Sequence, residues 1–245
     1  MRLRSCLTVA LVGCLSWVVA LAQNQPASTV RTLLSTGRIG SVIDTPLAFR
    51  LLSVRLSPTQ QASYTGPNAM LYAVAGGVRL QVGGDSQSVV EGGGAFIPSG
   101  RAAIFDTSAQ EPANFLLFIL SPVADIQKPP LESPATVEEL YRSPEPIPGL
   151  QPGPYEYSLT QVSLPPAMPP NPPHSRSGAA LYYIAAGSGM FTAGGTTEPR
   201  TAGMAHFEPR GLVHQWANPG DAPLTLIQAN ISPEGIPAVL AAGAQ

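Results

Sequence analysis

The sequence predicts an all-β protein built from two small antiparallel β-barrels in tandem, joined by a proline-rich linker that carries one short helix. Three observations support this fold class. Apolar residues fall in short runs that are separated by glycine-rich turns. Glycine (24) and proline (27) are spread along all 245 residues, which suits many short strands better than long helices. Turn residues of the first half also recur in the second half at a fixed spacing.

The first 22 residues have the pattern of an export signal. Arg2 and Arg4 precede an apolar run, and Ala-Leu-Ala at residues 20–22 offers a small-residue cleavage site. The run is short and is followed by polar, proline-bearing sequence, which argues against a spanning helix. We expect cleavage after Ala22 and an exported protein, periplasmic or extracellular, without a membrane span. Lipid attachment at Cys14 and an uncleaved anchor are the alternatives, although a lipid tether should be followed by polar residues and Cys14 is not.

Cysteine content and charge exclude several classes of function. Both cysteines, Cys6 and Cys14, lie inside the predicted signal, so the mature chain has no disulfide, catalytic thiolate or thiolate metal site. The formal charge is −2 and Lys128 is the single lysine, so no basic surface is expected. We therefore predict no binding to nucleic acid.

Residues 23–122 are predicted to form the first barrel. Apolar alternation begins near Leu47 after a polar leader. Strand-like runs follow at residues 70–74, 78–82, 95–97 and 115–120, with glycine pairs or triplets between them.

Residues 123–154 are rich in proline and are predicted to be a linker. Within it, Ser133 is placed to cap a helix, Pro134 stands at the first helical position, and Glu138 and Glu139 follow. This pattern predicts a short helix over residues 133–142.

The second barrel, residues 155–245, repeats the first at an offset of 111 residues. Tyr72 matches Tyr183, since 183 − 72 = 111. The same offset pairs Gly76 with Gly187, Gly92 with Gly203, Phe96 with Phe207, Pro98 with Pro209, Gly100 with Gly211, and Pro122 with Pro233. Turn residues that match in register indicate two copies of one structural unit.

A motif near the end of the chain identifies that unit. Gly203, Pro209, Gly211, His214 and Asn218 follow the spacing Gly-x5-Pro-x-Gly-x2-His-x3-Asn. This stretch resembles the second conserved motif of the cupin superfamily. The resemblance implies a bicupin, in which each half is a jelly-roll-like barrel.

The first cupin motif, His-x-His-x3-Glu-x2-Tyr-x3-Gly, is matched only in part. His174, Tyr183 and Gly187 fit it, whereas Arg176 replaces the second His and Ala180 replaces the Glu. Members of the family hold a divalent metal with the two His and the Glu of this motif and the His of the other. Carried across, the resemblance makes His174 and His214 the candidate metal ligands.

Two imidazoles are one short of the three protein ligands that a catalytic metal usually has. Arg176 has no lone pair and stays protonated, so it cannot be a ligand. We therefore expect no cofactor, and a divalent transition metal at His174 and His214 is the alternative. In the first barrel the equivalent positions hold no ligand, which predicts a purely structural role; they are Ser63, Thr65, Ala69 and Ala103.

The same residues predict a small-molecule site in the second barrel. Trp216 follows His214 by two residues, so both side chains point to one face of a strand. His174 and Arg176 alternate in the same way, and Tyr182 is expected on that face. An arginine fork, two imidazoles, an indole and a phenol suit a carboxylate or a sugar-like ligand. The competing interpretation is that these side chains are ordinary barrel core.

His206 is expected to be a surface or interface residue. Phe207 matches Phe96 and is expected to face the core, which would send His206 and Glu208 to the opposite face of their strand.

The leading hypothesis is an exported bicupin that binds a small polar or anionic molecule in its second barrel. A metal-dependent enzyme of the oxygenase or isomerase type is the alternative, using His174 and His214 with a further ligand outside the motif. A non-catalytic assembly protein is a third hypothesis, because exposed strand edges favour homodimers. The sequence leaves open whether any reaction is catalysed, since it lacks the Gly-x-Ser-x-Gly, phosphate-loop and His-Glu-x-x-His motifs.

Overall fold

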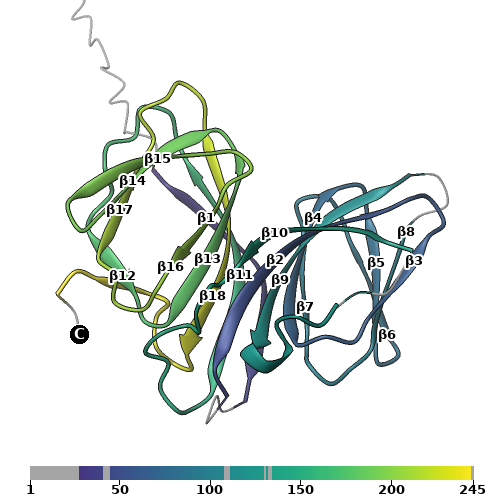
Figure 1. Ribbon diagram of the computed structural model, residues 1–245. Helices are drawn as coiled ribbons and strands as arrows, with labels where there is room; N and C mark the ends of the chain where they lie inside the picture. Colours follow the sequence, from purple (N-terminus) through teal and green to yellow (C-terminus); the bar gives the residue numbers. More distant parts are fainter. Residues whose placement is uncertain (1–27, 41–44, 108–110, 130, 132–133, 244–245) are drawn as a thin grey trace, which may run out of the picture.

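The computed structural model describes residues 28–40, 45–107, 111–129, 131 and 134–243. The predicted signal (1–22) lies outside these residues. Within them the protein is almost entirely β-structure, arranged as two barrels side by side (Figure 1). No helix in the described part of the chain is long and apolar enough to cross a membrane. The all-β prediction is thus confirmed.

Each barrel is made of two sheets. The first barrel has a five-stranded and a four-stranded sheet, and the second has two five-stranded sheets. The first barrel joins β10-β2-β9-β4-β7 to β3-β8-β5-β6, and the second joins β1-β11-β18-β13-β16 to β15-β14-β17-β12-β19. The strands of the first barrel are β2 (Leu47–Leu56), β3 (Gln61–Tyr64), β4 (Asn68–Ala75), β5 (Val78–Val82), β6 (Asp85–Val89), β7 (Gly94–Ile97), β8 (Ala103–Thr107), β9 (Ala113–Pro122) and β10 (Thr136–Arg142). Those of the second are β1 (Val30–Ile39), β11 (Tyr155–Leu164), β12 (His174–Arg176), β13 (Ala179–Ala186), β14 (Ser188–Ala193), β15 (Thr196–Thr201), β16 (Ala205–Glu208), β17 (His214–Ala217), β18 (Leu224–Pro233) and β19 (Val239–Ala241).

The 111-residue offset appears directly in the strands. β4, β7 and β9 start at residues 68, 94 and 113, and β13, β16 and β18 start at 179, 205 and 224, a difference of 111 in each case. The two halves therefore have the same design.

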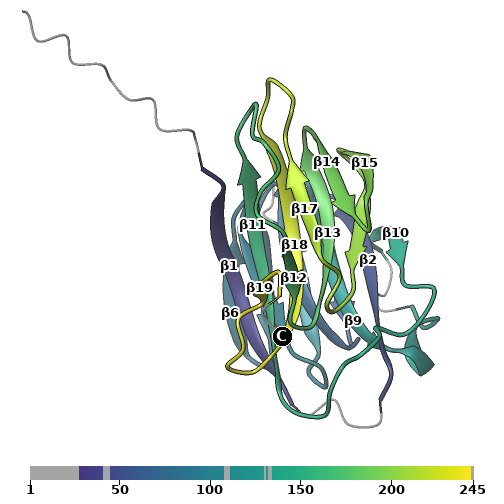
Figure 2. The same cartoon turned by 90° about the vertical axis from the view of Figure 1, so that its left-hand side faces the viewer.

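The two barrels exchange edge strands. β1, from the first half of the chain, pairs with β11 of the second barrel, and Figure 2 shows it along one edge of that barrel. β10, from the predicted linker, pairs with β2 of the first barrel. The predicted domains, 23–122 and 155–245, differ from this arrangement, because β1 belongs to the second barrel and β10 to the first.

The predicted linker helix over residues 133–142 is wrong. Thr136–Arg142 is the edge strand β10, and the helical turn near it is the short 3-10 helix Val123–Asp125. Local capping signals favoured a helix, but pairing with β2 supplies a full row of backbone hydrogen bonds that a short isolated helix cannot match.

The central strands of two five-stranded sheets that face each other, β10-β2-β9-β4-β7 and β1-β11-β18-β13-β16, are buried on both faces. In β9, Phe115, Leu117 and Ile119 point into the first barrel, while Leu116 and Phe118 point toward the second. A strand that is buried on both faces has apolar residues at every position. This explains the continuous apolar run at residues 115–120. A shared core therefore joins the barrels.

Contacts across this shared core are close. Phe49 packs against Tyr157 with ring centroids 6.4 Å apart, and the Tyr157 hydroxyl donates a hydrogen bond to the Phe118 carbonyl at 2.9 Å. A Cβ added to Gly37 of β1 would lie 2.2 Å from the Phe96 ring, so glycine is required there for close approach.

We predict that Gly37→Ala destabilises the protein by about 1–3 kcal/mol, because the Phe96 ring must leave its packed position. Chemical denaturation measures the change. Gly40→Ala is the control, since nothing lies within 4 Å of an added Cβ at Gly40. The double variant Gly37→Ala/Phe96→Leu should lose less than the sum of the two single changes. An unchanged midpoint for Gly37→Ala would contradict this packing.

Candidate functional site

The motif histidines meet inside the second barrel. His174 of β12 and His214 of β17 are direct cross-strand partners, and their ring centroids lie 4.3 Å apart. Both side chains are buried. The structure thus brings together the two residues that the cupin motifs single out.

Backbone carbonyls fix the tautomer of both rings. His174 Nδ1 lies 3.0 Å from the Pro172 carbonyl oxygen, and His214 Nδ1 lies 2.8 Å from that of Leu212. A carbonyl oxygen only accepts, so Nδ1 carries the hydrogen in each ring. In its neutral form, His174 therefore has its lone pair on Nε2, which is buried without a hydrogen-bond partner. Burial lowers the pKa of His174 to about 4, so this ring is neutral at pH 7.

Arg176 is buried in an ion pair with Glu208. Its Nε donates to Glu208 Oε2 at 2.8 Å, and the two side chains are 1% and 0% exposed. Arg176 Nη2 also donates to the Tyr182 hydroxyl, and Trp216 Nε1 donates to Glu208 Oε1 at 3.1 Å. The alternation of side chains thus correctly predicts that Arg176, Tyr182 and Trp216 lie together. It did not place Glu208 in the site.

Glu208 supplies a carboxylate from the neighbouring strand. It lies directly opposite Ala180 in the pairing of β13 with β16, so the acid missing from the first motif comes from one strand away. Phe207 does point to the opposite side, as expected, and there it packs in the core shared by the barrels. The side that Glu208 takes is the barrel interior rather than solvent. The apolar run 179–184, typical of a strand buried on both faces, is the signal that could have revealed this.

The charge on Glu208 is maintained despite complete burial. Burial alone would raise the pKa of Glu208, but the Arg176 guanidinium and His214 outweigh it and hold the pKa at about 2. His214 Nε2 lies 3.0 Å from Glu208 Oε1, although the direction of approach is not that of a hydrogen bond. Glu208 is therefore ionised at neutral pH between a guanidinium and an imidazole.

His206, expected to be a surface or interface residue, is half-buried and faces the interior of the second barrel. Its ring lies 4.1 Å from that of Phe191 (centroid to centroid), and its Nε2 is buried without a partner. Arg200 Nε donates to His206 Nδ1 at 3.4 Å. Burial lowers the pKa of His206 to about 4. The face of β16 that carries His206 and Glu208 points into the barrel, where His206 is half-buried and Glu208 is fully buried.

The first barrel has an apolar interior at the matching positions. An offset of 111 takes Tyr182, His206, Glu208, His214 and Trp216 to Leu71, Ala95, Ile97, Ala103 and Phe105. All five belong to one buried apolar cluster. The positions that match His174 and Arg176 are Ser63, which is half-buried, and Thr65, which is exposed.

The donor set does not fit a divalent metal. Within the described ranges, no three His, Cys, Asp or Glu side chains are placed to hold one ion together. Glu208, the nearest carboxylate to the two motif histidines, already pairs with Arg176 and accepts from Trp216. The positive charge of the Arg176 guanidinium, which is bonded to Glu208, would also repel a cation bound to that carboxylate.

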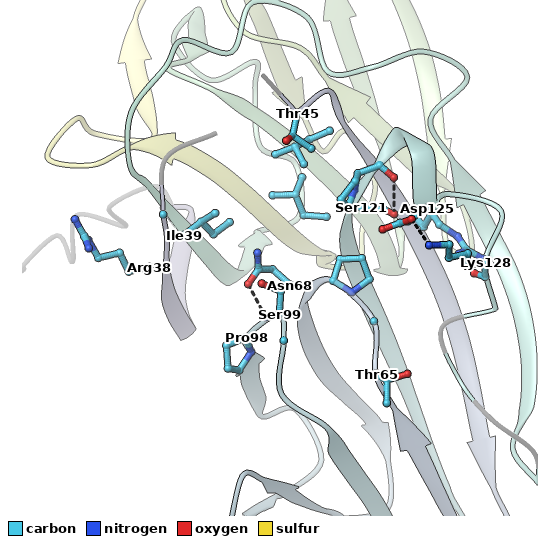
Figure 3. A pocket seen from close by; sticks show the side chains of 18 of the residues that line it. Arg38, Ile39, Thr45, Thr65, Asn68, Pro98, Ser99, Ser121, Asp125 and Lys128 are labelled. Atoms are coloured by element: carbon cyan, nitrogen blue, oxygen red, sulfur yellow. Dashed lines mark hydrogen bonds and ion pairs between the residues drawn. The ribbon is translucent and has the colours of Figure 1, made fainter. Parts of the chain in front are cut away.

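Two hollows open at the ends of the barrels, and the one in the second barrel is lined in part by Arg176. One, of about 730 Å³, lies at the end of the first barrel (Figure 3). Its charged groups pair with each other or with neighbours, as Lys128 Nζ does with Asp125 at 2.5 Å. The other, of about 660 Å³, occupies the equivalent place in the second barrel, because Thr65 and Ser99 of the first match Arg176 and Arg210 of the second. The pair of hollows is thus a property of the repeated fold.

We predict that breaking the buried pair is far more costly than breaking an exposed one. Arg176→Met or Glu208→Gln should each destabilise the protein by about 3–5 kcal/mol, because each leaves a buried group without its partner. The double variant should lose less than the sum. The control is Arg38→Ala, which removes an exposed pair with Glu234 of similar length, 2.7 Å, and should change the midpoint little. Additive losses would show that the two side chains are not coupled.

Stability should fall as the pH drops below 6.5. The unfolded chain protonates His174 and His206 near pH 6.5, whereas burial keeps both neutral in the fold until about pH 4. The unfolded state therefore binds more protons in this window, and each histidine should lower the stability by at most about 3 kcal/mol at pH 4, less where solvent screens its charge. The Glu208 contribution is lost only below about pH 4.5, toward pH 2. Denaturation midpoints between pH 4 and 7 test this; a flat profile, or no flattening in His174→Gln/His206→Gln, would contradict it.

Comparison with known proteins gives a consistent assignment. A family model described as the cupin domain matches residues 160–229. Among curated proteins no match was found. The structure of oxalate decarboxylase from Bacillus subtilis at pH 4.6 is similar with a TM-score of 0.57, at 16% identity over 84% of this chain and 74% of that one.

Other structures of the same enzyme agree. A point mutant has a TM-score of 0.56 at 16% identity, covering 89% of this chain and 80% of that one. A structure associated with the Mn(II) centres of the B. subtilis enzyme has a TM-score of 0.55 at 15% identity, covering 87% and 77%. At these identities the likeness concerns the fold. Together with the domain match, it shows a fold shared with these enzymes and a match to the cupin domain at residues 160–229, within the second barrel.

Proposed function

We propose that the second barrel binds a small polar or anionic molecule, with carboxylates the favoured class. The observation that carries this proposal is the difference between two barrels of one design within one chain. The first has an apolar interior at the positions where the second has Tyr182, Glu208, His214 and Trp216.

The fold does not need these polar groups, because the first barrel forms without them. Burying a polar group with no partner costs roughly 1–3 kcal/mol, and burying a charge pair is often no better than an apolar core. A cluster of this kind is expected where it serves binding or chemistry. The competing interpretation, that these residues are ordinary core, leaves that cost unexplained.

The unpartnered atoms define what a ligand should offer. Arg176 Nη1 is a buried donor without an acceptor, and neutral His174 has a lone pair on Nε2 without a donor. A small acid with a hydroxyl, or one with a second, protonated carboxyl group, would satisfy both atoms.

A second arginine adds positive charge at the rim of this barrel. Arg31 of β1 pairs with Val162, whose side chain belongs to the barrel interior. The Arg31 residue is exposed, yet partial burial of its guanidinium lowers its pKa, and the charges of Arg176 and Glu208 also act on it. No ion pair joins Arg31 to an acid of the described residues. It is therefore placed to attract an anion toward Arg176.

A metal-dependent cupin enzyme is the second candidate. The observation that favours it is Glu208, which lies beside His214 and is a carboxylate outside the motif positions. The structural neighbours are oxalate decarboxylases, and one is described by its Mn(II) centres. In this chain, however, Glu208 is held by Arg176, which keeps the carboxylate from a metal.

Export from the cytoplasm is part of the same proposal. It is supported by the signal-like pattern of residues 1–22, and a homodimer through strand edges remains the expected assembly if one forms.

Thermal unfolding of the mature protein with a panel of small carboxylates and sugars tests the proposal. Oxalate belongs in the panel because of the named activity of the structural neighbours. A ligand at about 100 times its Kd should stabilise the protein by about 2.7 kcal/mol. His174→Ala should abolish the shift, whereas Ser63→Ala, the equivalent change in the first barrel, should keep it.

Elemental analysis of the same preparation separates the two candidates. About one transition metal per chain, lost in His174→Ala, would replace the proposed function by the metal-dependent one. No shift across the panel, together with an unchanged protein in His174→Ala, would support the barrel-core interpretation instead.

A further inference from the structure

We propose that the hollow at the end of the second barrel binds a carboxylic acid with an apolar body, and that Arg210 supplies the positive charge at its rim. The hollow has a volume of about 660 Å³, which is within the usual range of small-molecule sites. The inference rests on the proposed function, because Arg176 takes part in both. It adds the place where the ligand lies and the class of acid that fits there.

The lining of this hollow differs from that of its counterpart in the first barrel. Seven lining residues of one hollow match lining residues of the other at the offset of 111. The pairs are Thr65 with Arg176, Gly66 with Ser177, Ser99 with Arg210, Gly100 with Gly211, Pro122 with Pro233, Asp125 with Ile236, and Pro129 with Leu240. Two neutral side chains of the first hollow are thus arginines in the second, and the acid is an isoleucine.

The second hollow has an excess of positive charge. Its lining contains Arg176 and Arg210 and no acid, whereas in the first hollow Lys128 pairs with Asp125 (Figure 3). Glu208 neutralises Arg176 from inside the barrel. No ion pair joins Arg210 to an acid in the described part of the chain. The charge of Arg210 is therefore left to attract an anion.

Two backbone carbonyls hold the Arg210 side chain in place. Its Nε donates to the Ser177 carbonyl oxygen at 3.1 Å, and its Nη1 donates to that of Gly149 at 3.2 Å. These bonds use two of the five N–H groups of the guanidinium, and among the described residues Nη2 is left for a carboxylate. Because Gly149 and Ser177 line the hollow too, the guanidinium is fixed at its rim.

Two buried polar atoms of the lining residues are without a hydrogen-bond partner in the described ranges. They are Arg176 Nη1 and Ser177 Oγ, in residues that are 1% and 5% exposed. Both can donate a hydrogen bond, and a polar group is costly to bury unpaired. A carboxylate bound in the hollow is an acceptor that could satisfy such donors.

The remaining lining is largely apolar and selects the class of acid. Pro148, Pro233, Ile236 and Leu240 contribute to it, and Ile236 is 49% exposed. An aromatic or branched body would remove this surface from water, whereas a small hydrophilic anion would leave it exposed. Phenylacetate has both the carboxylate and the apolar body, so it is the probe of choice.

The experiment is calorimetric titration of the mature protein at pH 7 with phenylacetate, glycolate and inorganic phosphate. Arg210→Gln removes the charge at the rim, and Ile236→Asp introduces the acid that the first hollow has. Both positions are exposed, so the fold should tolerate these changes, and the melting temperature without ligand checks this. Arg101→Gln is the matched control, because it removes an exposed arginine from a turn of the first barrel.

We expect phenylacetate to bind more tightly than glycolate or phosphate. Arg210→Gln and Ile236→Asp should each weaken its binding about tenfold, and Arg101→Gln should leave it unchanged. This pattern supports the inference even if His174→Ala has no effect, in which case the ligand lies in the hollow and not beside the histidines.

Other results would overturn the inference and separate it from the proposed function. Phenylacetate binding that survives both changes but is lost in His174→Ala would place the ligand inside the barrel and leave the proposed function standing. Binding of glycolate without phenylacetate would do the same. Phosphate binding as tight as that of phenylacetate would contradict the apolar class. Failure of every acid in the wider panel would remove both proposals.

Discussion

The central strands of the two five-stranded sheets between the barrels are buried on both faces, and most of the structure depends on this constraint. One face of each sheet lines its own barrel and the other packs against the opposite barrel, as Phe118 and Tyr157 do. Strands in these sheets must be apolar on both sides, so charged residues are largely confined to the rims and outer strands. The exchange of β1 and β10 extends each sheet and ties each half of the chain to the other.

This constraint makes the polar interior of the second barrel exceptional. A charge such as that of Glu208 is stable inside the barrel only because Arg176 pairs with it and Trp216 donates to it. The first barrel solves the same packing problem with aliphatic and aromatic side chains. Comparison of the two barrels therefore distinguishes residues that the shared fold requires from the polar residues that only the second barrel has.

The sequence predicts those features that depend on local spacing. The turn motif gives His214, and the alternation along two strands places Trp216 and Arg176 on the inner face. The apolar run 179–184 indicates a neighbouring strand buried on both faces, but the sequence does not give the long-range register that pairs Ala180 with Glu208.

One other prediction failed for the same kind of reason. Residues 133–142 have local helix signals, but the pairing of β10 with β2 decides their structure. The place of His206 has a related cause, because Phe207 faces one core and the face of β16 that carries His206 points into the barrel.

The most direct measurement of the buried pair is the ¹⁵N–¹H resonance of Arg176 Nε in solution. A guanidinium bonded to a carboxylate inside the barrel should give a resolved Nε–H signal that exchanges slowly with water, persists to about pH 4 because of the low pKa of Glu208, and disappears in Glu208→Gln. A signal lost to rapid exchange at neutral pH, like those of exposed arginines, would show that Arg176 and Glu208 do not form a closed pair.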